Sequence, residues 1–460
     1  MALIKSISGI RGTIGGKPGE GLTPVDIVKF SAAYGTWLIG SSGKKSATVV
    51  VGRDARRSGS MVSSMVISTL QCLGISVTDI GLASTPTVEI AVTGLNADGG
   101  IIITASHNPA EWNALKLLNG SGEFLSAAEG AKILEIAENE NFVFVNDENR
   151  GKVSVDSTWT KKHIEMILAL KNVDVKSIKS ADYKISIDCI NSVGGIIVPA
   201  LLEALGVKTV NGLNTVPDGN FAHNPEPLKE NLTDISDLVV KTQSDLGFVV
   251  DPDVDRLAVI CEDGTMFGEE YTLVSVADYV LKSTPGNTVS NMSSTRALKD
   301  VTEKHGSSHF SSAVGEVNVV EEMKQRNAVI GGEGNGGVIY PEIHYGRDAL
   351  VGIALFLSHL SKSGLSCSAL RKSYPDYFMA KKKMTLSPDS DFKGIIEKVK
   401  KNFSEGIIDE RDGLWIGLKN GWVQIRKSNT EPIMRIYSEG KTNSEAEHLA
   451  DTVISIVKKE

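Results

Sequence analysis

A short apolar strand that runs into a polar loop constrains the fold of this chain most. Residues 101–103 are three isoleucines that follow two glycines, which is typical of a strand buried on both faces of a helix-covered sheet. Thr104-Ala105-Ser106-His107-Asn108-Pro109 comes next, and Lys116 follows. Open α/β sheets carry reactive groups at the carboxyl ends of strands. The segment predicts an α/β fold with a reactive cluster of Ser106, His107 and Lys116, or else a plain polar turn.

Alternating strands and helices surround this segment. Thr23 and Pro24 predict the N-cap and the first residue of a helix. β-branched runs at residues 47–52 and 75–80 predict strands on either side of a helix with an apolar stripe. Because this alternation is typical of right-handed βαβ units, we expect a largely parallel sheet. Similar units recur later, and a composition shift near residue 373 predicts a smaller α+β domain.

An acidic triplet follows the apolar strand predicted at residues 245–250. Its carboxylates are Asp251, Asp253 and Asp255, with Arg256 next in the chain. In an extended segment, residues at i, i+2 and i+4 share one face, so the three carboxylates would converge. A hard divalent cation would offset their repulsion, and all-oxygen ligands favour Mg²⁺ or Ca²⁺ over zinc. The sequence therefore predicts a metal site, the alternative being a solvated acidic turn.

Two glycine-rich loops offer polar side chains. The segment at residues 6–16 carries Arg11, whose guanidinium could bind a phosphate bidentately. A second loop is expected after a strand at residues 328–330, and it places Glu333 and Asn335 among glycines. A carboxylate and an amide together supply the acceptors and donors that sugar hydroxyls need. Each loop is weak evidence alone, because glycine-rich segments are often simple turns.

A third polar loop is expected between two strands near the C-terminus. Within five residues it contains an arginine, two hydroxyls and an amide: Arg426, Ser428, Asn429 and Thr430. Such groups favour a phosphate clamp. A polar turn is the alternative.

Composition excludes several classes of protein. With 460 residues the chain needs three or four domains, and a formal net charge of −8 argues against a nucleic-acid surface. No stretch approaches the ~20 apolar residues of a membrane span. Four cysteines lie far apart without a CxxC pair, as in a reducing cytosol. We expect a cytoplasmic protein that binds neither nucleic acid nor membranes.

These stretches, in this order, resemble the α-D-phosphohexomutases. The resemblance covers essentially the whole chain and rests on SGIRG at Ser8, TASHNP at Thr104, DPDVDR at Asp251, GEGNGG at Gly332 and RKSNTEP at Arg426. It implies three related α/β domains with mixed sheets and a C-terminal TATA-binding-protein-like α+β domain around a central cleft. The expected domains are 1–152, 153–254, 255–370 and 371–460.

The resemblance also implies a role for each motif. Ser106 is similar to the phosphoserine that donates and recovers the phosphoryl group. An oxygen of that phosphoserine would bind Mg²⁺ together with the three aspartates. The remaining positions are implied to act beside the reacting phosphate (Arg11, His107, Lys116 and Arg256), in sugar recognition (Glu333 and Asn335) and in the clamp for the other phosphate (Arg426, Ser428, Asn429 and Thr430).

The expected reaction moves a phosphoryl group between C6 and C1 of a hexose phosphate through a bisphosphate. A hexose 1,6-bisphosphate would be intermediate and activator, and the chain would be a monomer or homodimer. The expected activity is that of a phosphoglucosamine mutase, with phosphomannomutase/phosphoglucomutase as the alternative. In the common loop Gly-Glu-x-Ser-Gly-His, Asn335 replaces the serine and Gly337 the histidine, and this variant resembles the archaeal-type branch of the family. A metal-dependent sugar phosphatase and an inactive sugar-phosphate-binding protein are the other classes. A Ser-His hydrolase is not expected, because neighbouring Ser106 and His107 should not form a nucleophile–base pair.

Overall fold

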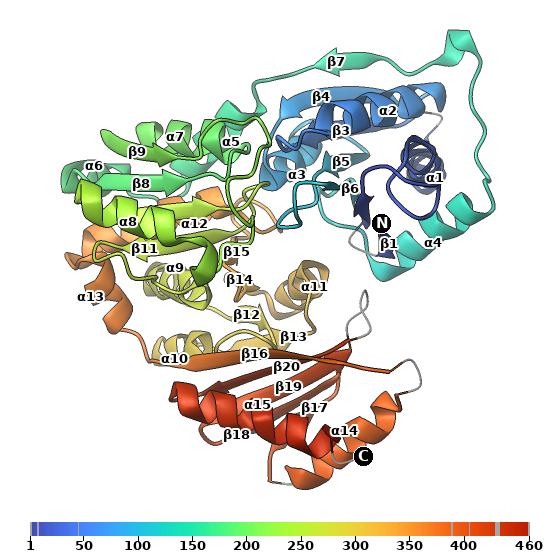
Figure 1. Cartoon of the computed structure of the whole chain (residues 1–460). Coiled ribbons are helices and arrows are strands. Elements are labelled where there is room, and N and C mark those ends of the chain that lie inside the picture. Colours follow the sequence, from blue (N-terminus) through green and yellow to red (C-terminus); the bar gives the residue numbers. More distant parts are fainter. Residues whose placement is uncertain are drawn as a thin grey trace. The chain divides into compact units, whose positions relative to one another are not determined.

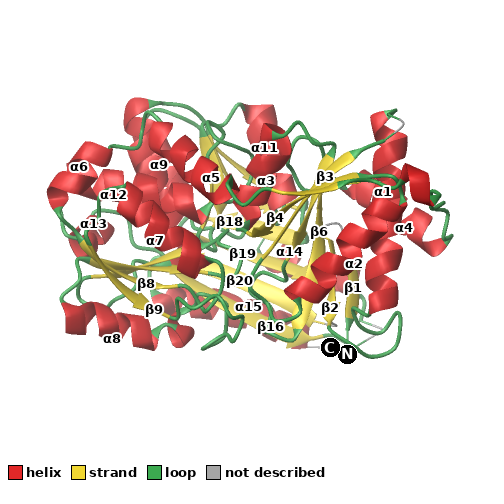
Figure 2. Cartoon of the chain, turned by 90° about the horizontal axis from the view of Figure 1, so that it is seen from above, coloured by secondary structure: helices red, strands yellow, loops and turns green. Residues whose placement is uncertain are grey.

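The computed structural model describes residues 2–6, 9–44, 46–387, 390–403, 405–427 and 433–458, shown in Figure 1. The chain forms two compact units. Unit 1 comprises Met1–Thr272 and Gly336–Ser368, and unit 2 comprises Leu273–Asn335 and Ala369–Glu460. Helices flank the strands in both (Figure 2). Among the described residues, no helix is both long and apolar enough to span a membrane.

Unit 1 begins with a seven-stranded mixed sheet. In spatial order its strands are β1 (Leu3–Ser6), β2 (Gly9–Thr13), β6 (Trp112–Leu118), β5 (Gly99–Ile103), β3 (Thr48–Arg53), β4 (Ser76–Leu82) and β7 (Val153–Val155). β5, β3, β4 and β7 are parallel, whereas β1, β2 and β6 pair antiparallel. The expectation of a largely parallel sheet is therefore wrong for one half of it. The sequence analysis missed β6, which returns the chain after the Ser106 loop.

Both faces of this sheet are covered, as the all-apolar strand predicted. Ile101 and Ile103 pack with α1 (Pro24–Ser42), α2 (Gly59–Cys72) and α4 (Ala127–Glu138). Ile102 points the other way and packs with α3 (Thr85–Gly94) and with Trp159 of α5 (Trp159–Ala169). Thr23 caps α1 and Pro24 is its first residue, as predicted. Burial on both faces fixes the place where β5 ends, and hence the position of the loop that follows.

The second sheet of unit 1 positions the acidic triplet. Its order is β11 (Leu257–Cys261), β10 (Leu246–Val250), β8 (Lys184–Asp188) and β9 (Thr209–Leu213). β10 is parallel to β8 and antiparallel to β11, so the triplet lies in the turn that joins β10 to β11. The accompanying elements of unit 1 are α6 (Val175–Ala181), α7 (Gly194–Ala204), α8 (Thr233–Thr242), β15 (Gly337–Ile339) and α12 (Ala349–Ser363).

Unit 2 contains parallel strands and helices in its first part. β12 (Thr288–Asn291) pairs in parallel with β13 (His309–Ser312) and with β14 (Ile330–Glu333). Two of its helices begin in unit 1, α9 (Glu269–Ser283) and α13 (Cys367–Lys372), and two lie wholly in unit 2, α10 (Ala297–Lys304) and α11 (Glu316–Arg326). The strand predicted at residues 328–330 instead begins at Ile330 and runs to Glu333, and its Gly332 pairs with Ser290 of β12. Glu333 thus closes a strand instead of lying in a loop.

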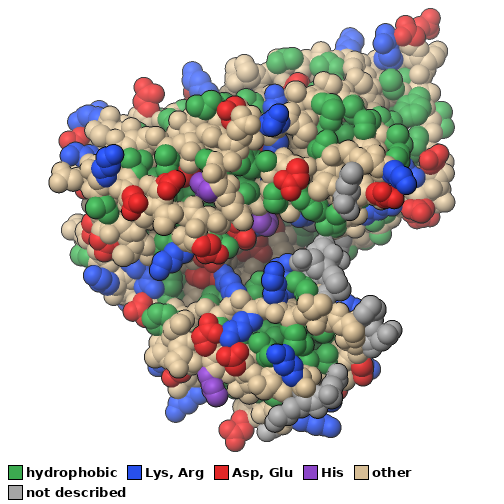
Figure 3. Space-filling view, viewed as in Figure 1, with side chains coloured by type: hydrophobic (Ala, Val, Ile, Leu, Met, Phe, Trp, Pro, Cys, Tyr) green, Lys and Arg blue, Asp and Glu red, His purple; other side chains and the backbone are tan. Residues whose placement is uncertain are grey.

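The C-terminal part of unit 2 is a five-stranded antiparallel sheet. Its order is β16 (Phe378–Thr385), β20 (Ile433–Gly440), β19 (Gly421–Lys427), β18 (Leu414–Leu418) and β17 (Ile407–Asp409). α14 (Phe392–Asn402) and α15 (Asn443–Lys458) cover one face and share its apolar core (Figure 1). These sheets confirm the predicted fold class of α/β domains with a smaller α+β domain. Acidic and basic side chains are interspersed on the face shown in Figure 3.

Candidate active site

Ser106 lies in a tightly held loop at the carboxyl end of β5. Its backbone has φ of +48°, a left-handed conformation that is uncommon for residues other than glycine. Its amide donates to Thr104 Oγ1 at 2.9 Å, and its hydroxyl donates to Asp251 Oδ2 at 2.8 Å. The residue is 7% exposed. Strained backbone is a feature of functional sites, and here it directs the hydroxyl at the acidic triplet.

Arg56 braces this loop, and no role for it was predicted. Its guanidinium donates all five N–H groups: Nε to Asp54 Oδ2, Nη1 to the carbonyls of Pro109 and Trp112, and Nη2 to those of Ser106 and Asn108. The distances range from 2.5 to 3.1 Å. Asp54 also accepts from Thr104 Oγ1 at 2.6 Å. Arg56 is 1% exposed, so the brace is a buried one.

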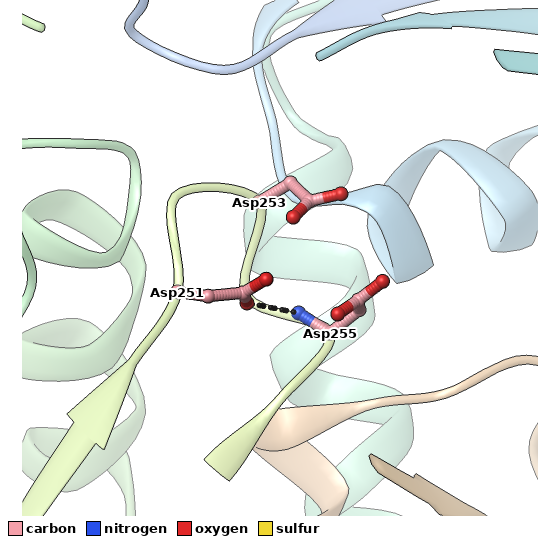
Figure 4. A group of neighbouring side chains, drawn as sticks. All are labelled: Asp251, Asp253 and Asp255. Carbon is pink, nitrogen blue, oxygen red and sulfur yellow. Dashed lines mark hydrogen bonds between the residues drawn. The ribbon is translucent and has the colours of Figure 1, made fainter. Parts of the chain in front are cut away.

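The acidic triplet converges through a tight turn, not along an extended segment as predicted. Val254 N donates to the Asp251 carbonyl, and Val254 has φ of +60°. Asp251 Oδ1 accepts from the amides of Asp255 and Arg256 at 3.1 and 3.2 Å. Figure 4 shows the three carboxylates around this turn. All three are fully buried, and one carboxylate oxygen from each lies within 4.8 Å of the other two.

Cationic and hydroxyl groups hold two of the carboxylates. Lys116, inside β6, donates from Nζ to Asp253 Oδ2 at 2.7 Å and lies 3.6 Å from Asp255 Oδ2. Thr85 Oγ1 donates to Asp253 Oδ2 at 2.6 Å, and Arg347 Nη2 donates to Asp255 Oδ2 at 2.6 Å. Burial lowers the pKa of Lys116, but the two carboxylates outweigh it and leave the pKa above its usual value.

The remaining predicted residues of unit 1 lie near the same centre. Burial and the charge of Arg256 lower the pKa of Arg11, which lies on β2, while Asp253 opposes this. Arg256 and burial hold the pKa of His107 well below its usual value. His107 Nδ1 lies 3.4 Å from Ser106 Oγ. The left-handed turn at Ser106 brings the two side chains near each other, and the expectation that they do not form a nucleophile–base pair stays a prediction.

The triplet has the properties of a metal site. Burial and the neighbouring Asp255 and Asp253 raise the pKa of Asp251 well above its usual value. Burial opposes ionisation of Asp253, but Lys116 holds its pKa below the usual range. Among the described residues, Asp253 Oδ1 and Asp255 Oδ1 are buried without a hydrogen-bond partner. Buried unpaired carboxylate oxygens are costly, and a hard cation would satisfy them.

The predicted sugar loop and phosphate clamp lie in unit 2 and are connected there. Glu333 Oε1 accepts from Asn291 Nδ2 at 2.8 Å and from the Gly315 amide at 3.2 Å. Asn335 Nδ2 lies 3.4 Å from Glu333 Oε2. The preceding amide, that of Val314, donates to Asp412 Oδ2, which also accepts from Arg426 Nη1 at 3.2 Å. The loop at Val314 and Gly315 thus joins Glu333 to Arg426.

Three residues of the predicted phosphate clamp lie outside the residues that the structure describes: Ser428, Asn429 and Thr430. The side chains that sequence reasoning left without a role are Asp54, Arg56, Thr85, Arg347 and Asp412. A signal existed for the first two, because GRDARR at Gly52 begins in the last two residues of β3, whose carboxyl end meets that of β5 at one sheet edge. No comparable pattern marks Arg347, which is distant in sequence from the triplet that it contacts.

Comparison with known proteins agrees with the fold and the motifs. Models of phosphoglucomutase/phosphomannomutase α/β/α domains I, II and III match residues 3–144, 161–264 and 268–377, and the C-terminal domain model matches 387–456. The chain is an isomerase of the mutase class. It belongs to the α-D-phosphohexomutase family. The predicted boundaries after residues 152, 254 and 370 stay predictions.

Relatives and solved structures extend over nearly the whole chain. A phosphoglucomutase/phosphomannomutase of Thermococcus kodakarensis is 37% identical over 97% of this chain and 98% of its own. A phosphoglucosamine/phosphogalactosamine mutase of Sulfurisphaera tokodaii is 32% identical over 99% of both chains. The crystal structure of a phosphoglucomutase/phosphomannomutase family protein from Burkholderia thailandensis has a TM-score of 0.83. It is 24% identical and covers 99% of this chain and 98% of that one, which shows a shared fold.

Proposed function

We propose that this protein interconverts the 6-phosphate and 1-phosphate of a hexose through a phosphoserine at Ser106 and a bisphosphate intermediate. The observation that carries the proposal is the position of Ser106 Oγ. It lies 2.8 Å from Asp251 Oδ2, near Lys116 and two further buried aspartates. Phosphoryl transfer depends mainly on positioning and on neutralising charge. A strained nucleophile beside a metal-ligand set and several cations meets both needs.

Mg²⁺ would be held by Asp251, Asp253 and Asp255, together with an oxygen of the phosphorylated Ser106. When bound, it would neutralise charge on the phosphoryl oxygens. Lys116 and Arg256 supply fixed positive charge beside the reacting group, and Arg11 lies near enough to Arg256 and Asp253 to act with them. His107, with its depressed pKa, is neutral near pH 7, so Nδ1 can accept a proton from a hydroxyl at this point.

The second phosphate of the substrate would bind Arg426 with Ser428, Asn429 and Thr430. Glu333 and Asn335 would contact sugar hydroxyls common to several hexoses. Holding the remote phosphate converts its binding energy into orientation of the reacting end. Because the phosphate at either end must fit one clamp, a planar guanidinium with hydroxyl partners suits the need.

For the sugar we propose glucosamine 6-phosphate and glucosamine 1-phosphate. The name of the Sulfurisphaera tokodaii relative and the SISGIRG and GEGNGG motifs support this choice. The alternative is a phosphomannomutase/phosphoglucomutase, which the Thermococcus kodakarensis relative and the Ser428-Asn429-Thr430 motif favour. A single polar contact at C2 contributes about 1 kcal/mol, so we expect a preference among these sugars and not exclusivity.

Two measurements test the proposal. Intact-protein mass spectrometry after incubation with glucose 1,6-bisphosphate should show one added phosphoryl group on the wild type and none on Ser106→Ala. Side-by-side kcat/KM values on glucosamine, glucose and mannose phosphates identify the sugar. An active Ser106→Ala variant without any phosphoform of the wild type would refute the phosphoserine. A kcat/KM for glucosamine phosphate at least about a hundredfold below that for mannose or glucose phosphate would be a larger difference than one polar contact explains. That result would refute the choice of glucosamine but not the mutase reaction.

A further inference from the structure

A row of three cations crosses the C-terminal sheet next to the predicted clamp. Arg426 of β19 lies directly opposite Arg435 of β20, and Arg435 lies directly opposite Lys383 of β16. Directly paired residues in an antiparallel sheet point to the same face. We refer to Lys383, Arg435 and Arg426 as the cationic row. Like charges at such positions repel one another, so the row favours anionic ligands.

The row faces away from the helices that cover the sheet. Ile425 and Ile436, the neighbours in sequence of Arg426 and Arg435, belong to the apolar core shared with α14 and α15. Lys382, next to Lys383, points to that covered side, where Nζ lies 2.7 Å from Asp451 Oδ1 of α15. Because side chains alternate along a strand, the three cations of the row are on the face opposite α14 and α15.

One carboxylate does not satisfy Arg426. Asp412 accepts from Arg426 Nη1 at 3.2 Å. Within the part of the chain that the structure describes, Arg426 Nε is buried and makes no hydrogen bond. A buried guanidinium N–H without an acceptor is costly. This donor points independently to an oxyanion ligand at the row.

We propose that the cationic row is a holding site for the hexose bisphosphate, which binds both of its phosphates while the sugar exchanges ends. The proposal rests on the mutase reaction proposed above and adds Arg435 and Lys383 to its binding residues. Neighbouring strands are about 4.8 Å apart, so Lys383 and Arg426 leave the backbone about 10 Å apart. Their side chains can therefore contact phosphates at opposite ends of one hexose.

The row should distinguish the bisphosphate from the monophosphates. A monophosphate has one phosphate group and satisfies Arg426, leaving Lys383 without a phosphate. A bisphosphate carries a second phosphate that reaches the other cations of the row. Charge-assisted hydrogen bonds to phosphate are the strong ones. Losing Arg435 or Lys383 should thus weaken binding of the bisphosphate selectively.

The test is equilibrium binding by isothermal titration calorimetry to the full-length chain carrying Ser106→Ala, which prevents phosphoryl transfer. Glucose 1,6-bisphosphate and glucose 6-phosphate are the two probes, with Mg²⁺ present. Adding Arg435→Gln or Lys383→Gln should weaken bisphosphate binding about tenfold and glucose 6-phosphate binding at most about twofold. Lys382→Gln, on the covered face of the same strand, is the matched control and should change neither.

A kinetic arm uses the same substitutions with Ser106 intact. Arg435→Gln and Lys383→Gln should raise the concentration of added bisphosphate that gives half-maximal turnover, while Lys382→Gln should not. Equal weakening for both probes, or no weakening, would overturn the holding site. A wild type that neither binds glucose 6-phosphate nor becomes phosphorylated on Ser106 would instead overturn the proposed reaction.

Discussion

At the scale of single residues, the three aspartates determine whether the chain can use a metal. Asp253→Asn removes the negative charge that pairs with Lys116. It also replaces a carboxylate that has one oxygen without a hydrogen-bond partner. We expect kcat to fall by at least about a hundredfold, because charge on the phosphoryl group is no longer neutralised. The measurement is turnover against Mg²⁺ concentration, with Asp237→Asn, at an exposed carboxylate, as control. Wild-type turnover that persists in excess chelator would contradict the metal site.

Arg56 carries a second prediction at this scale. Arg56→Lys keeps the positive charge but has three donors in place of five, so at least two of the five hydrogen bonds that now hold Asp54 and the Ser106 loop are lost. We expect kcat to fall roughly tenfold to a hundredfold with little change in KM, because under the proposed reaction a misplaced Ser106 slows phosphoryl transfer without altering the proposed phosphate clamp. Steady-state kinetics and the phosphorylated fraction of Ser106 report this.

The neighbouring Arg57→Lys is the matched control, because Arg57 is exposed. A raised KM with unchanged kcat in Arg56→Lys would show that the hydrogen bonds of Arg56 support substrate binding instead. Arg56 also marks the limit of sequence reading at this scale. Ser106, Lys116 and the three aspartates are recognisable from their motifs. GRDARR places Arg56 at the same sheet edge as Ser106, but the sequence does not show that one guanidinium makes five hydrogen bonds.

At the scale of elements, a buried carboxylate joins β20 to α10 within unit 2. Glu439 accepts hydrogen bonds from the Arg296 amide, just before α10, and from Trp422 Nε1 of β19. Burial raises the pKa of Glu439 to about 7, although hydrogen bonds from Thr295 and the Arg296 amide oppose this. The folded state therefore holds a proton that the unfolded chain releases near pH 4.5.

The sign of the resulting pH dependence follows from linkage. A carboxyl group with a raised folded-state pKa stabilises the protein at low pH, and this contribution is lost as the pH rises from about 4.5 through about 7. At about 1.4 kcal/mol per pKa unit, the loss is roughly 3 kcal/mol. Denaturant unfolding of wild type and Glu439→Gln across this range should show the difference. Parallel stability curves for the two proteins would contradict it.

Some helices and strands could be predicted from the sequence and others could not. β5, β10 and α1 were predictable, because an all-apolar run favours a buried strand and a Thr-Pro pair favours a helix start. β6 was missed because its residues, Trp112 to Leu118, alternate poorly and follow a turn directly. The acidic turn was predicted as extended, since sequence periodicity cannot show that Val254 takes a left-handed conformation. The carboxylates converge in either geometry, so the prediction of a metal site did not depend on this error.

At the scale of the whole molecule, the clamp should separate a mutase from a phosphatase. A phosphatase needs no second phosphate site, whereas a mutase must retain a bisphosphate. Arg426→Ala should lower kcat/KM by about tenfold or more, because remote binding energy orients the reacting end. Catalytic amounts of added glucose 1,6-bisphosphate should stimulate the wild type. Steady release of inorganic phosphate, with no such stimulation, would favour the phosphatase.

The division of the chain into two units has a consequence for how such proteins diversify. Unit 1 contains Ser106 and the acidic triplet, whereas Glu333, Asn335 and Arg426 belong to unit 2, which is built from two separate stretches of chain. Under the proposed roles, phosphoryl transfer and substrate binding are inherited on different stretches of the gene. Recombination limited to the codons for residues 273–335 and 369–460 would exchange the sugar-binding and phosphate-binding residues between relatives and leave the phosphoserine chemistry intact.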